Sequence, residues 1–291
     1  MSDTRSRGAR GARPRSGTVH IKQHNGPAYA ILILGSAVMV FPLVWQVIVS
    51  LESTEESRSF PPVFWPAHPS LAAYTAVFEQ LPIARQLLTS TLITVARTAG
   101  QLVFCSLAGY AFARLRFPGR NLMFGLFLSV LMVPGACFLI PQYQIIQSLH
   151  LVDTWQGVAL PGLFSAFGTF LMRQFFAGLP RELEEAARLD GAGTIRTFAQ
   201  IMLPLARPGL VALTILTVLW SWNDMLWPLI VTTGQSKMPI SASLATLQGE
   251  HMTNYPLMMA GAVIAMLPMI VLFMVLQRQF IAGIAFQGTK G

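Results

Sequence analysis

The segment from residue 179 to residue 204 reads LPRELEEAARLDGAGTIRTFAQIMLP and is a polar interruption in an otherwise apolar chain. Three glutamates follow Pro180, where they complement the positive end of a helix dipole, and Gly191 supplies a natural stop. Beyond this glycine, Ile195, Phe198 and Met202 recur at helical spacing. The segment is therefore predicted to form two short helices joined by a glycine turn.

Long apolar runs flank this segment and recur along the whole chain. A helix that crosses a bilayer needs about 20 consecutive apolar residues. Six runs of about this length occur, at residues 28–49, 87–113, 121–140, 157–177, 209–231 and 256–276. Lipid offers no hydrogen-bond partner to the backbone, so such spans are expected to be helices. The sequence therefore predicts an all-α membrane protein with six transmembrane helices and a hairpin between the fourth and the fifth.

The composition supports a membrane protein and excludes a typical soluble enzyme. Of the 291 residues, 53% are hydrophobic and only 11% are charged, and the mean hydropathy is +0.55. A soluble domain has about 25% charged residues. The two cysteines, Cys105 and Cys137, each lie inside an apolar run and cannot make a disulfide framework or a zinc knuckle.

The basic residues set the expected orientation. Residues 1–27 are rich in arginine and are predicted to be a disordered cytoplasmic tail, while residues 28–291 are predicted to be the membrane domain, with a core at 86–278. With the tail inside, only Arg58, Arg85 and Lys237 fall in external segments. Both termini are therefore expected in the cytoplasm. The preference of basic residues for the cytoplasmic side explains the arginines of the tail, so no nucleic-acid partner is expected.

Two interpretations of the 179–204 hairpin follow from its physics. One is an amphipathic hairpin on the inner leaflet of the membrane. The other is a surface for a protein partner. The hairpin carries both signs of charge in similar numbers, whereas Lys and Arg dominate the polar face of a lipid-bound helix. This balance favours a protein partner.

The hairpin also resembles a known signature. Glu185-Ala186-Ala187, then Gly191, then Ile201-Met202-Leu203-Pro204 is similar to the EAA motif of membrane subunits in binding-protein-dependent ABC importers. The stretches 172–176 and 108–114 are similar to the carbohydrate-uptake branch, the maltose-type permeases. The resemblance extends over about residues 28–291.

This resemblance implies that the hairpin couples the chain to a cytoplasmic ATPase. Glu185 would be the polar contact to the ATPase, Ala186 and Ala187 the small packing face, and Gly191 the turn. The remaining coupling residues implied by the motif are Arg188, Leu189, Asp190, Ile201, Leu203 and Pro204.

The resemblance also implies a set of partners and a location. The partners would be a homologous second permease, two ATPase subunits, an extracytoplasmic solute-binding protein and membrane lipid. The second permease would make a heterodimer, although one chain leaves open whether it pairs with itself. The location would be the bacterial cytoplasmic membrane. The solute would be a sugar or a similar polyhydroxylated compound, whose identity the sequence leaves open.

Two charged residues fall at membrane depth, where a charge is costly. Asp224 follows Trp222 and Asn223 near the outer end of the fifth span, and Arg97 lies in the second. One interpretation is that these four residues line the solute pathway; the other is an interfacial tryptophan belt with Asp224 reaching water. For Arg97, pairing with Asp224 across helices and snorkelling to the membrane surface both stay open.

The sequence lacks the motifs of an enzyme. It contains no G-x-x-x-x-G-K-[ST], no H-E-x-x-H, no C-x-x-C and no G-x-S-x-G. We therefore expect no catalytic residue, no metal site and no cofactor bound by this chain, with ATP and Mg²⁺ used by a partner ATPase. A secondary transporter driven by an ion gradient is the alternative, and it predicts more buried acids and internal inverted repeats than the chain has.

Overall fold

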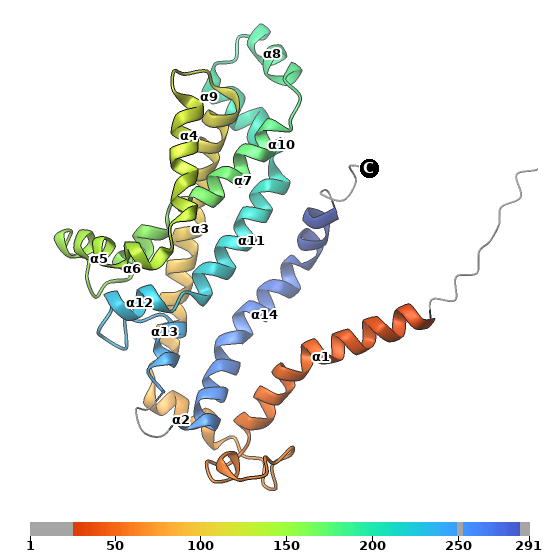
Figure 1. The fold of residues 1–291 in the computed structure, drawn as a ribbon, viewed down its shortest axis with the longest axis vertical. Helices are drawn as coiled ribbons and strands as arrows, with labels where there is room; N and C mark the ends of the chain where they lie inside the picture. Colours follow the sequence, from red (N-terminus) through yellow and green to blue (C-terminus); the bar gives the residue numbers. More distant parts are fainter. Residues whose placement is uncertain (1–25, 249–252, 286–291) are drawn as a thin grey trace, which may run out of the picture. The chain divides into compact units, whose positions relative to one another are not determined.

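The computed structural model describes residues 26–248 and 253–285, and every regular element within these ranges is a helix (Figure 1). In chain order these are α1 (Gly26–Ser50), η1 (Glu56–Arg58), α2 (Ala72–Gln80), α3 (Ile83–Arg114), α4 (Arg120–Ser129), η2 (Val130–Met132), η3 (Gly135–Phe138), α5 (Leu139–Ser148), α6 (Trp155–Ala159), η4 (Leu160–Gly162), α7 (Ala166–Ala177), α8 (Glu182–Leu189), α9 (Thr194–Thr197), η5 (Phe198–Met202), α10 (Leu203–Leu205), α11 (Arg207–Asn223), α12 (Leu226–Val231), α13 (Ile240–Ala245) and α14 (Tyr255–Ala285). The all-helical class is confirmed for this part of the chain.

The chain divides into two units, one ending at Val44 and one beginning at Trp45. Within the first unit, the side chains of α1 from residue 28 to residue 43 are exposed and predominantly apolar. Such an all-round apolar surface suits surrounding lipid. The predicted tail, residues 1–27, lies outside the described residues except for its last two, as does the chain after residue 285.

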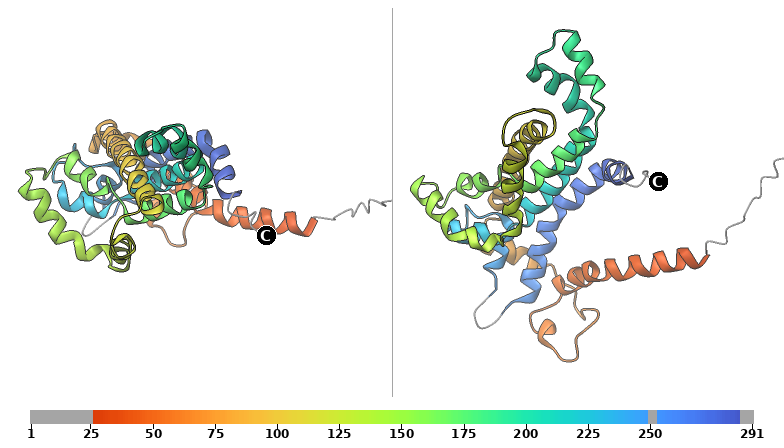
Figure 2. Two further views of the ribbon diagram at one scale, coloured as in Figure 1. Left: turned by 90° about the horizontal axis from the view of Figure 1, so that it is seen from above. Right: turned by 45° about the horizontal axis from the view of Figure 1, so that its top comes forward.

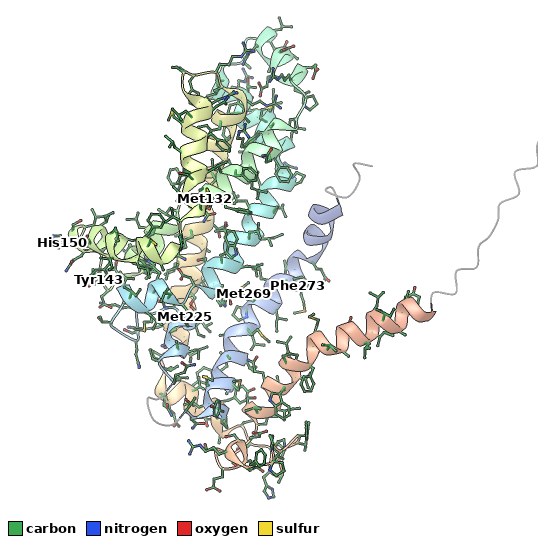
Figure 3. The ribbon with its side chains drawn as sticks, in the orientation of Figure 1. Met132, Tyr143, His150, Met225, Met269 and Phe273 are labelled. Carbon is green, nitrogen blue, oxygen red and sulfur yellow. The ribbon has the colours of Figure 1, made fainter. Side chains whose placement is uncertain are left out.

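Fewer continuous membrane-length helices are present than the six that the sequence predicts. Within the described ranges, three helices are long and apolar enough to cross a membrane: Ala28–Ser50, Ile83–Arg114 and Tyr255–Val275. Two further pairs of helices meet this test only when each bent pair counts as one span. Large apolar side chains such as Met132 and Phe273 are more than half exposed on the described surface (Figure 3).

The predicted span 121–140 is bent in the structure. Its two halves, Arg120–Met132 and Gly135–Ser148, meet at an angle of 102°. The break falls at Val133, which has an extended backbone with φ −89° and ψ 126°. The next residue, Pro134, disfavours the helical conformation of the residue before it, which explains where the helix ends.

The predicted span 157–177 is also broken. The short helix α6 continues into the single turn η4, and helix α7 begins only at Ala166. Ser165 caps α7 by accepting a hydrogen bond from the backbone N–H of Gly168 at 3.2 Å. The 12 residues of α7 are too few to cross a bilayer as a continuous helix.

Helices α3, α7 and α11 form the centre of the second unit. All three run side by side in both figures, and α14 lies along α11 and α2 (Figures 1 and 2). One buried cluster joins α3, α7 and α11 around Met172, Phe176, Met202 and Leu213. Another joins α2, α3, α13 and α14 around Val77, Ile83 and Ile240.

A seam of polar side chains on α3 bonds to the broken segment beside it. Arg97 Nη2 donates a hydrogen bond to the carbonyl of Val158 at 2.7 Å, and Gln101 Nε2 donates to the carbonyl of Gly162 at 2.9 Å. Cys105 Sγ donates to the carbonyl of Ser165 at 3.5 Å. Each donor precedes its acceptor by 60 or 61 residues, so the two segments run parallel in constant register. At Val158 and Gly162 the seam supplies partners for carbonyls of the broken segment, which lipid would not do, whereas the carbonyl of Ser165 also accepts from the backbone N–H of Thr169.

Close approach of α3 to α7 requires a glycine at residue 109. A Cβ added there would lie 2.8 Å from Met172 Cβ and 2.9 Å from the backbone nitrogen of Arg173. The backbones of α3 and α7 are therefore in direct contact at this point, and a side chain there would require one helix to move. This is the packing of small residues that membrane helices use in place of a hydrophobic driving force.

A clasp joins two loops through Asp153. Its carboxylate accepts hydrogen bonds from the backbone N–H groups of Thr233 and Gly234, each at 3.0 Å, and from Lys237 Nζ at 2.6 Å. The hydrogen bond from Lys237, together with the two backbone donors, lowers the pKa of Asp153 from 3.8 to about 2. The clasp ties the start of α6 to the loop after α12.

We predict that Gly109→Ala lowers the thermal stability of the detergent-purified protein by about 1 to 3 kcal/mol, because the added methyl forces α3 and α7 apart. The matched control is Gly125→Ala on α4, where nothing lies within 4 Å of the added Cβ. That control is expected to be neutral or to gain up to about 1 kcal/mol from helix propensity. Equal melting temperatures for the two variants would contradict the close-packing argument.

We predict that Asp153→Asn destabilises the protein by an amount that depends on pH. Because the pKa of Asp153 is lower in the folded protein than its ordinary 3.8, the stabilisation is complete above that value and is lost as the pH falls through about 2. Thermal unfolding of wild type and variant between pH 7 and pH 2 should therefore converge at the acid end. A matched Glu79→Gln variant, at an exposed acid on α2, should show no such convergence. A gap between wild type and Asp153→Asn that stays constant down to pH 2 would refute the clasp.

Candidate functional site

An ion pair joins α3, one of the helices of membrane-spanning length, to the end of α11. Arg97 Nη1 lies 2.8 Å from Asp224 Oδ2, with side-chain exposures of 9% and 24%. Asp224 is the residue at which α11 ends, in an extended backbone conformation with φ −65° and ψ 114°. Its backbone carbonyl accepts a hydrogen bond from Ser241 Oγ at 2.7 Å. Of the two alternatives for Arg97, pairing with Asp224 is the one found.

This pair borders a cavity of about 390 Å³. The lining residues come from α3, η4 and α11: Arg97, Gln101, Gly162, Thr217, Trp220, Ser221, Asn223 and Asp224. A hydrogen bond of 2.9 Å from Thr217 Oγ1 to Gln101 Oε1 links two of the walls. Arg97 Nε is buried and has no hydrogen-bond partner among the described residues.

The cavity combines several kinds of hydrogen-bonding group with an apolar ring. The carboxylate of Asp224 and the amide of Asn223 offer acceptors, and Arg97 and the amides offer donors. Trp220, which is 52% exposed, adds an aromatic face. Ligand sites in proteins typically combine such an apolar wall with a few convergent polar groups, a pattern suited to a molecule bearing several hydroxyl groups.

The structure differs from the sequence-based expectation at the tryptophans. Trp222 is buried in the cluster against α14, and its indole Nε1 donates to the carbonyl of Ala265 at 3.1 Å. Trp220, Gln101 and Thr217 line the cavity instead. Sequence reasoning missed Gln101, although its position four residues after Arg97 places both side chains on one face of the helix and could have indicated this wall.

A helical hairpin extends between α7 and α11. Helix α8 ends at Leu189, Gly191 has the left-handed φ of 78°, and α9, η5 and α10 follow. The second arm extends past Pro204, the last residue of the predicted hairpin segment, because the π-helical turn η5 leads directly into α10. The bend comes at Ala206 instead, where this arm and α11 meet at 75°.

The base of the hairpin is packed firmly against α3 and α7. Phe198 of the second arm lies with its ring centroid 5.0 Å from Tyr110 and 6.0 Å from Phe176. Met202 is completely buried in the same cluster, with Ile201 and Leu203 packed against it. The far end is different: Leu189 is 90% exposed and Ile195 82%.

The residues of the predicted coupling motif therefore fall in two environments. Ala187 is buried against the protein, and Ile201 and Leu203 are partly buried. The others are exposed on the hairpin: Glu185, Ala186, Arg188, Leu189, Asp190, Gly191 and Pro204.

Arg114, at the end of α3, bonds to the start of the hairpin. Its Nε donates to the carbonyl of Phe176 at 2.9 Å, and its Nη2 donates to the carbonyls of Phe176 and Leu179. The same Nε lies 3.5 Å from Glu184 Oε1, and both side chains are over 90% buried. Sequence reasoning treated Glu184 only as a helix-dipole residue and missed this link, whose partners are far apart in the chain.

The described residues contain no cluster of three or more His, Cys, Asp or Glu side chains that could hold a metal ion.

Comparisons with known proteins agree with this architecture. A family model described as "Binding-protein-dependent transport system inner membrane component" matches residues 103–285. The chain is 37% identical over 257 residues to the arabinooligosaccharides transport system permease protein AraQ of Halalkalibacterium halodurans, which covers 87% of this chain and 92% of that protein. It is 34% identical over 267 residues to the sn-glycerol-3-phosphate transport system permease protein UgpE of Escherichia coli, at 88% and 94% coverage.

A solved structure shares the fold. It is a crystal structure of a bacterial ABC transporter involved in the import of the acidic polysaccharide alginate. The superposition has a TM-score of 0.75 and covers 87% of this chain and 95% of that chain, at 22% sequence identity.

We predict that Asp224→Ala destabilises the protein by about 2 to 3 kcal/mol, because it leaves the buried charge of Arg97 without its partner while part of the cost is relieved by the exposure of the site. The double variant Arg97→Met with Asp224→Leu should lose less than the single variant, since no charge then stays buried. Asn223→Ala, in the same cavity but outside the ion pair, is the matched control and should be nearly neutral in thermal unfolding. If the stability lost by the double variant equalled the sum of the losses caused by Arg97→Met and Asp224→Leu separately, the pairing would be contradicted.

Proposed function

This chain belongs to the family of inner membrane components of binding-protein-dependent transport systems, and from this membership we propose that it is the permease subunit of an ATP-driven importer for a polyhydroxylated solute. The names of the two relatives refer to arabinooligosaccharides and to sn-glycerol-3-phosphate, and both are compounds with several hydroxyl groups. A sugar or a similar compound is therefore the proposed cargo. The same membership favours a binding-protein-dependent system over a carrier driven by an ion gradient.

The exposed end of the hairpin is the observation that carries the proposal of an ATPase partner. Leu189 and Ile195 stand almost fully exposed on a segment whose base is buried. Large apolar side chains grouped in this way mark protein interaction sites. We assign this surface to a cytoplasmic ATPase subunit, with Glu185, Arg188 and Asp190 as polar contacts around it.

The remaining architecture is proposed on the same basis. Six membrane crossings would be made if the bent pair 120–148, the interrupted segment 155–177 and the α11–α12 segment each count as one, together with α1, α3 and α14. Both termini would lie in the cytoplasm, and a second permease, two ATPase subunits and an extracytoplasmic solute-binding protein would complete the importer. ATP and Mg²⁺ would be bound by the ATPase subunits and not by this chain.

We propose that the cavity beside Arg97 and Asp224 is part of the solute pathway. Its support is the set of hydrogen-bonding groups around about 390 Å³ of space at membrane depth, with Trp220 as the aromatic wall. Sugar hydroxyls both donate and accept, so they match a lining that includes a carboxylate, amides and a guanidinium. Asn223 and Asp224 would contact solute, and Arg97 would hold Asp224 in place.

The contacts of the hairpin suggest how its motion would reach the pathway. The hairpin joins α7 directly to α11, and α11 ends at the pathway residues Asn223 and Asp224. Its base is bonded to α3 through Arg114 and packed against Tyr110. Rigid-body displacement of the hairpin by the ATPase would therefore tilt these helices together. Only a partner that contacts the hairpin differently in two states would shift the equilibrium between them.

The first experiment is purification of the chain from its native membrane in mild detergent, with co-purifying proteins identified by mass. We expect an ATPase and a second permease. Recovery of this chain alone in several detergents would argue against the importer.

Two glycines provide a matched test of the hairpin. At both Gly191 and Gly193 nothing lies within 4 Å of an added Cβ, but φ is 78° at Gly191 and −72° at Gly193. Gly191→Ala should therefore strain the turn by about 1 to 2 kcal/mol and lower solute uptake per ATP hydrolysed in reconstituted vesicles. Gly193→Ala should leave this ratio unchanged. The coupling role would be rejected if both variants behaved like wild type.

A further inference from the structure

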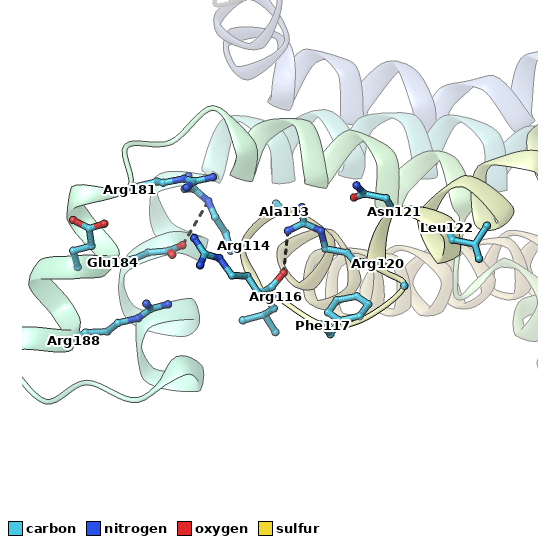
Figure 4. A pocket seen from close by; sticks show the side chains of 13 residues that line it. Ala113, Arg114, Arg116, Phe117, Arg120, Asn121, Leu122, Arg181, Glu184 and Arg188 are labelled. Atoms are coloured by element: carbon cyan, nitrogen blue, oxygen red, sulfur yellow. Dashed lines mark hydrogen bonds and ion pairs between the residues drawn. The ribbon is translucent and has the colours of Figure 1, made fainter.

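A second cavity, of about 830 Å³, lies beside the hairpin (Figure 4). One wall is the turn between α3 and α4, and the other is the first arm of the hairpin. Five arginines line it, at residues 114, 116, 120, 181 and 188, together with the two glutamates Glu184 and Glu185. Figure 4 shows Arg114, Arg116, Arg181 and Arg188 grouped around Glu184. The cavity is therefore strongly basic.

The two kinds of arginine in this cavity have different bonding. Arg114 is committed to Glu184 and to backbone carbonyls, and Arg120 Nη1 donates to the carbonyl of Leu115 at 3.0 Å. In contrast, the side chains of Arg116, Arg181 and Arg188 form no hydrogen bond or ion pair with other described residues. Like charges gathered in one cavity repel each other unless an anion enters. Arg116 and Arg181, which are not among the proposed ATPase contacts, are thus available for one.

The rim of the cavity is apolar and continues onto exposed apolar side chains of helix α4. Phe117 and Leu122 belong to the lining. Leu122, Met123 and Leu126 of α4 are 54% to 68% exposed. A phosphate carried on acyl chains would meet arginines at its head and apolar side chains below it. Basic pockets between membrane helices on the cytoplasmic side are suited to such headgroups.

We propose that this cavity binds the phosphate of an anionic phospholipid from the inner leaflet, and that the bound headgroup bridges the α3–α4 turn and the hairpin. Arginine recognises phosphate through its planar fork of donors, and two or more forks fix the group in place. Arg116 on one wall and Arg181 on the other hold the bridge. The lipid thereby restrains the hairpin. This inference rests on the proposed function for one point, the cytoplasmic orientation of the hairpin.

Retention of lipid by the purified protein tests the proposal directly. The protein, with whatever partners co-purify, is exposed in detergent to phosphatidylglycerol or phosphatidylcholine of identical acyl chains, and bound lipid is counted by native mass spectrometry. Phosphatidylglycerol should be retained in preference. Arg116→Gln with Arg181→Gln should weaken its binding about 30-fold, since each arginine near an anionic lipid contributes roughly a fivefold gain in affinity.

The matched control removes the same charge from the same side of the protein outside the cavity. Arg196→Gln with Arg207→Gln changes two exposed arginines of the second arm and the start of α11. This variant should keep the wild-type preference. Equal loss in both variants, or equal retention of both lipids by wild type, would overturn the site, because general positive charge would then explain the binding.

Two further measurements identify the source of the phosphate and guard against misfolding. Inorganic phosphate should fail to displace phosphatidylglycerol at equal concentration, and displacement by it would overturn the lipid assignment in favour of a free anion. Raising the salt concentration on wild type should erase the preference for phosphatidylglycerol without affecting phosphatidylcholine, because salt screens the arginines. A preference that survives high salt would contradict the proposal. Lipid retention requires no transport activity, so these outcomes are independent of whether the importer assignment holds.

Discussion

Side chains of helix α3 donate hydrogen bonds to backbone carbonyls of the neighbouring segment 155–165, whose helix is broken. The rest of the bundle is arranged around these hydrogen bonds. Unpaired carbonyls in lipid cost several kcal/mol each, so irregular backbone survives at membrane depth only where protein supplies the partner. Arg97 and Gln101 supply it at Val158 and Gly162. Nearer its N-terminus the same helix makes further polar contacts: Thr94 donates to the hydroxyl of Ser221 on α11, Ser90 accepts from the backbone N–H of Ile240, and Gln86 donates to the hydroxyl of Ser243.

The consequence of this seam is that the central helix is polar where a lone membrane helix would be apolar. The seam opens the space beside Arg97 because η4 and the end of α11 both depart from regular helix there. The cavity is therefore a product of broken helices held open by their hydrogen bonds. Its polar groups already serve the fold, and a solute would compete for groups whose geometry the protein has fixed in advance.

At its other end, α3 meets the hairpin through a different kind of contact. Arg114 satisfies carbonyls at the end of α7, where helical bonding stops, and it neutralises Glu184 on the first arm. The aromatic rings of Tyr110, Phe176 and Phe198 complete the joint. One long helix thus contacts the residues of the proposed solute pathway in its middle and the hairpin at its end, so the two regions are connected through a single rigid element.

Much of this protein was readable from the sequence. Hydropathy runs established a helical membrane protein, because lipid permits few alternatives for an apolar backbone of that length. The glycine turn at Gly191 was readable because a left-handed φ favours glycine at that position. The spacing of the EAA-like residues indicated the family. These features are local, so neighbours in the chain carry the whole signal.

Only the tertiary structure decided which partners the polar residues take. Arg97 pairs with Asp224 127 residues away, Trp222 turns to α14 while Trp220 faces the cavity, and the predicted spans 121–140 and 157–177 break at positions that hydropathy does not register. A hydropathy window averages over such breaks, because their cost is met by side chains on another helix. The grouping of arginines beside the hairpin likewise arises from two segments more than 60 residues apart. Contacts of that kind exist only after the helices have packed.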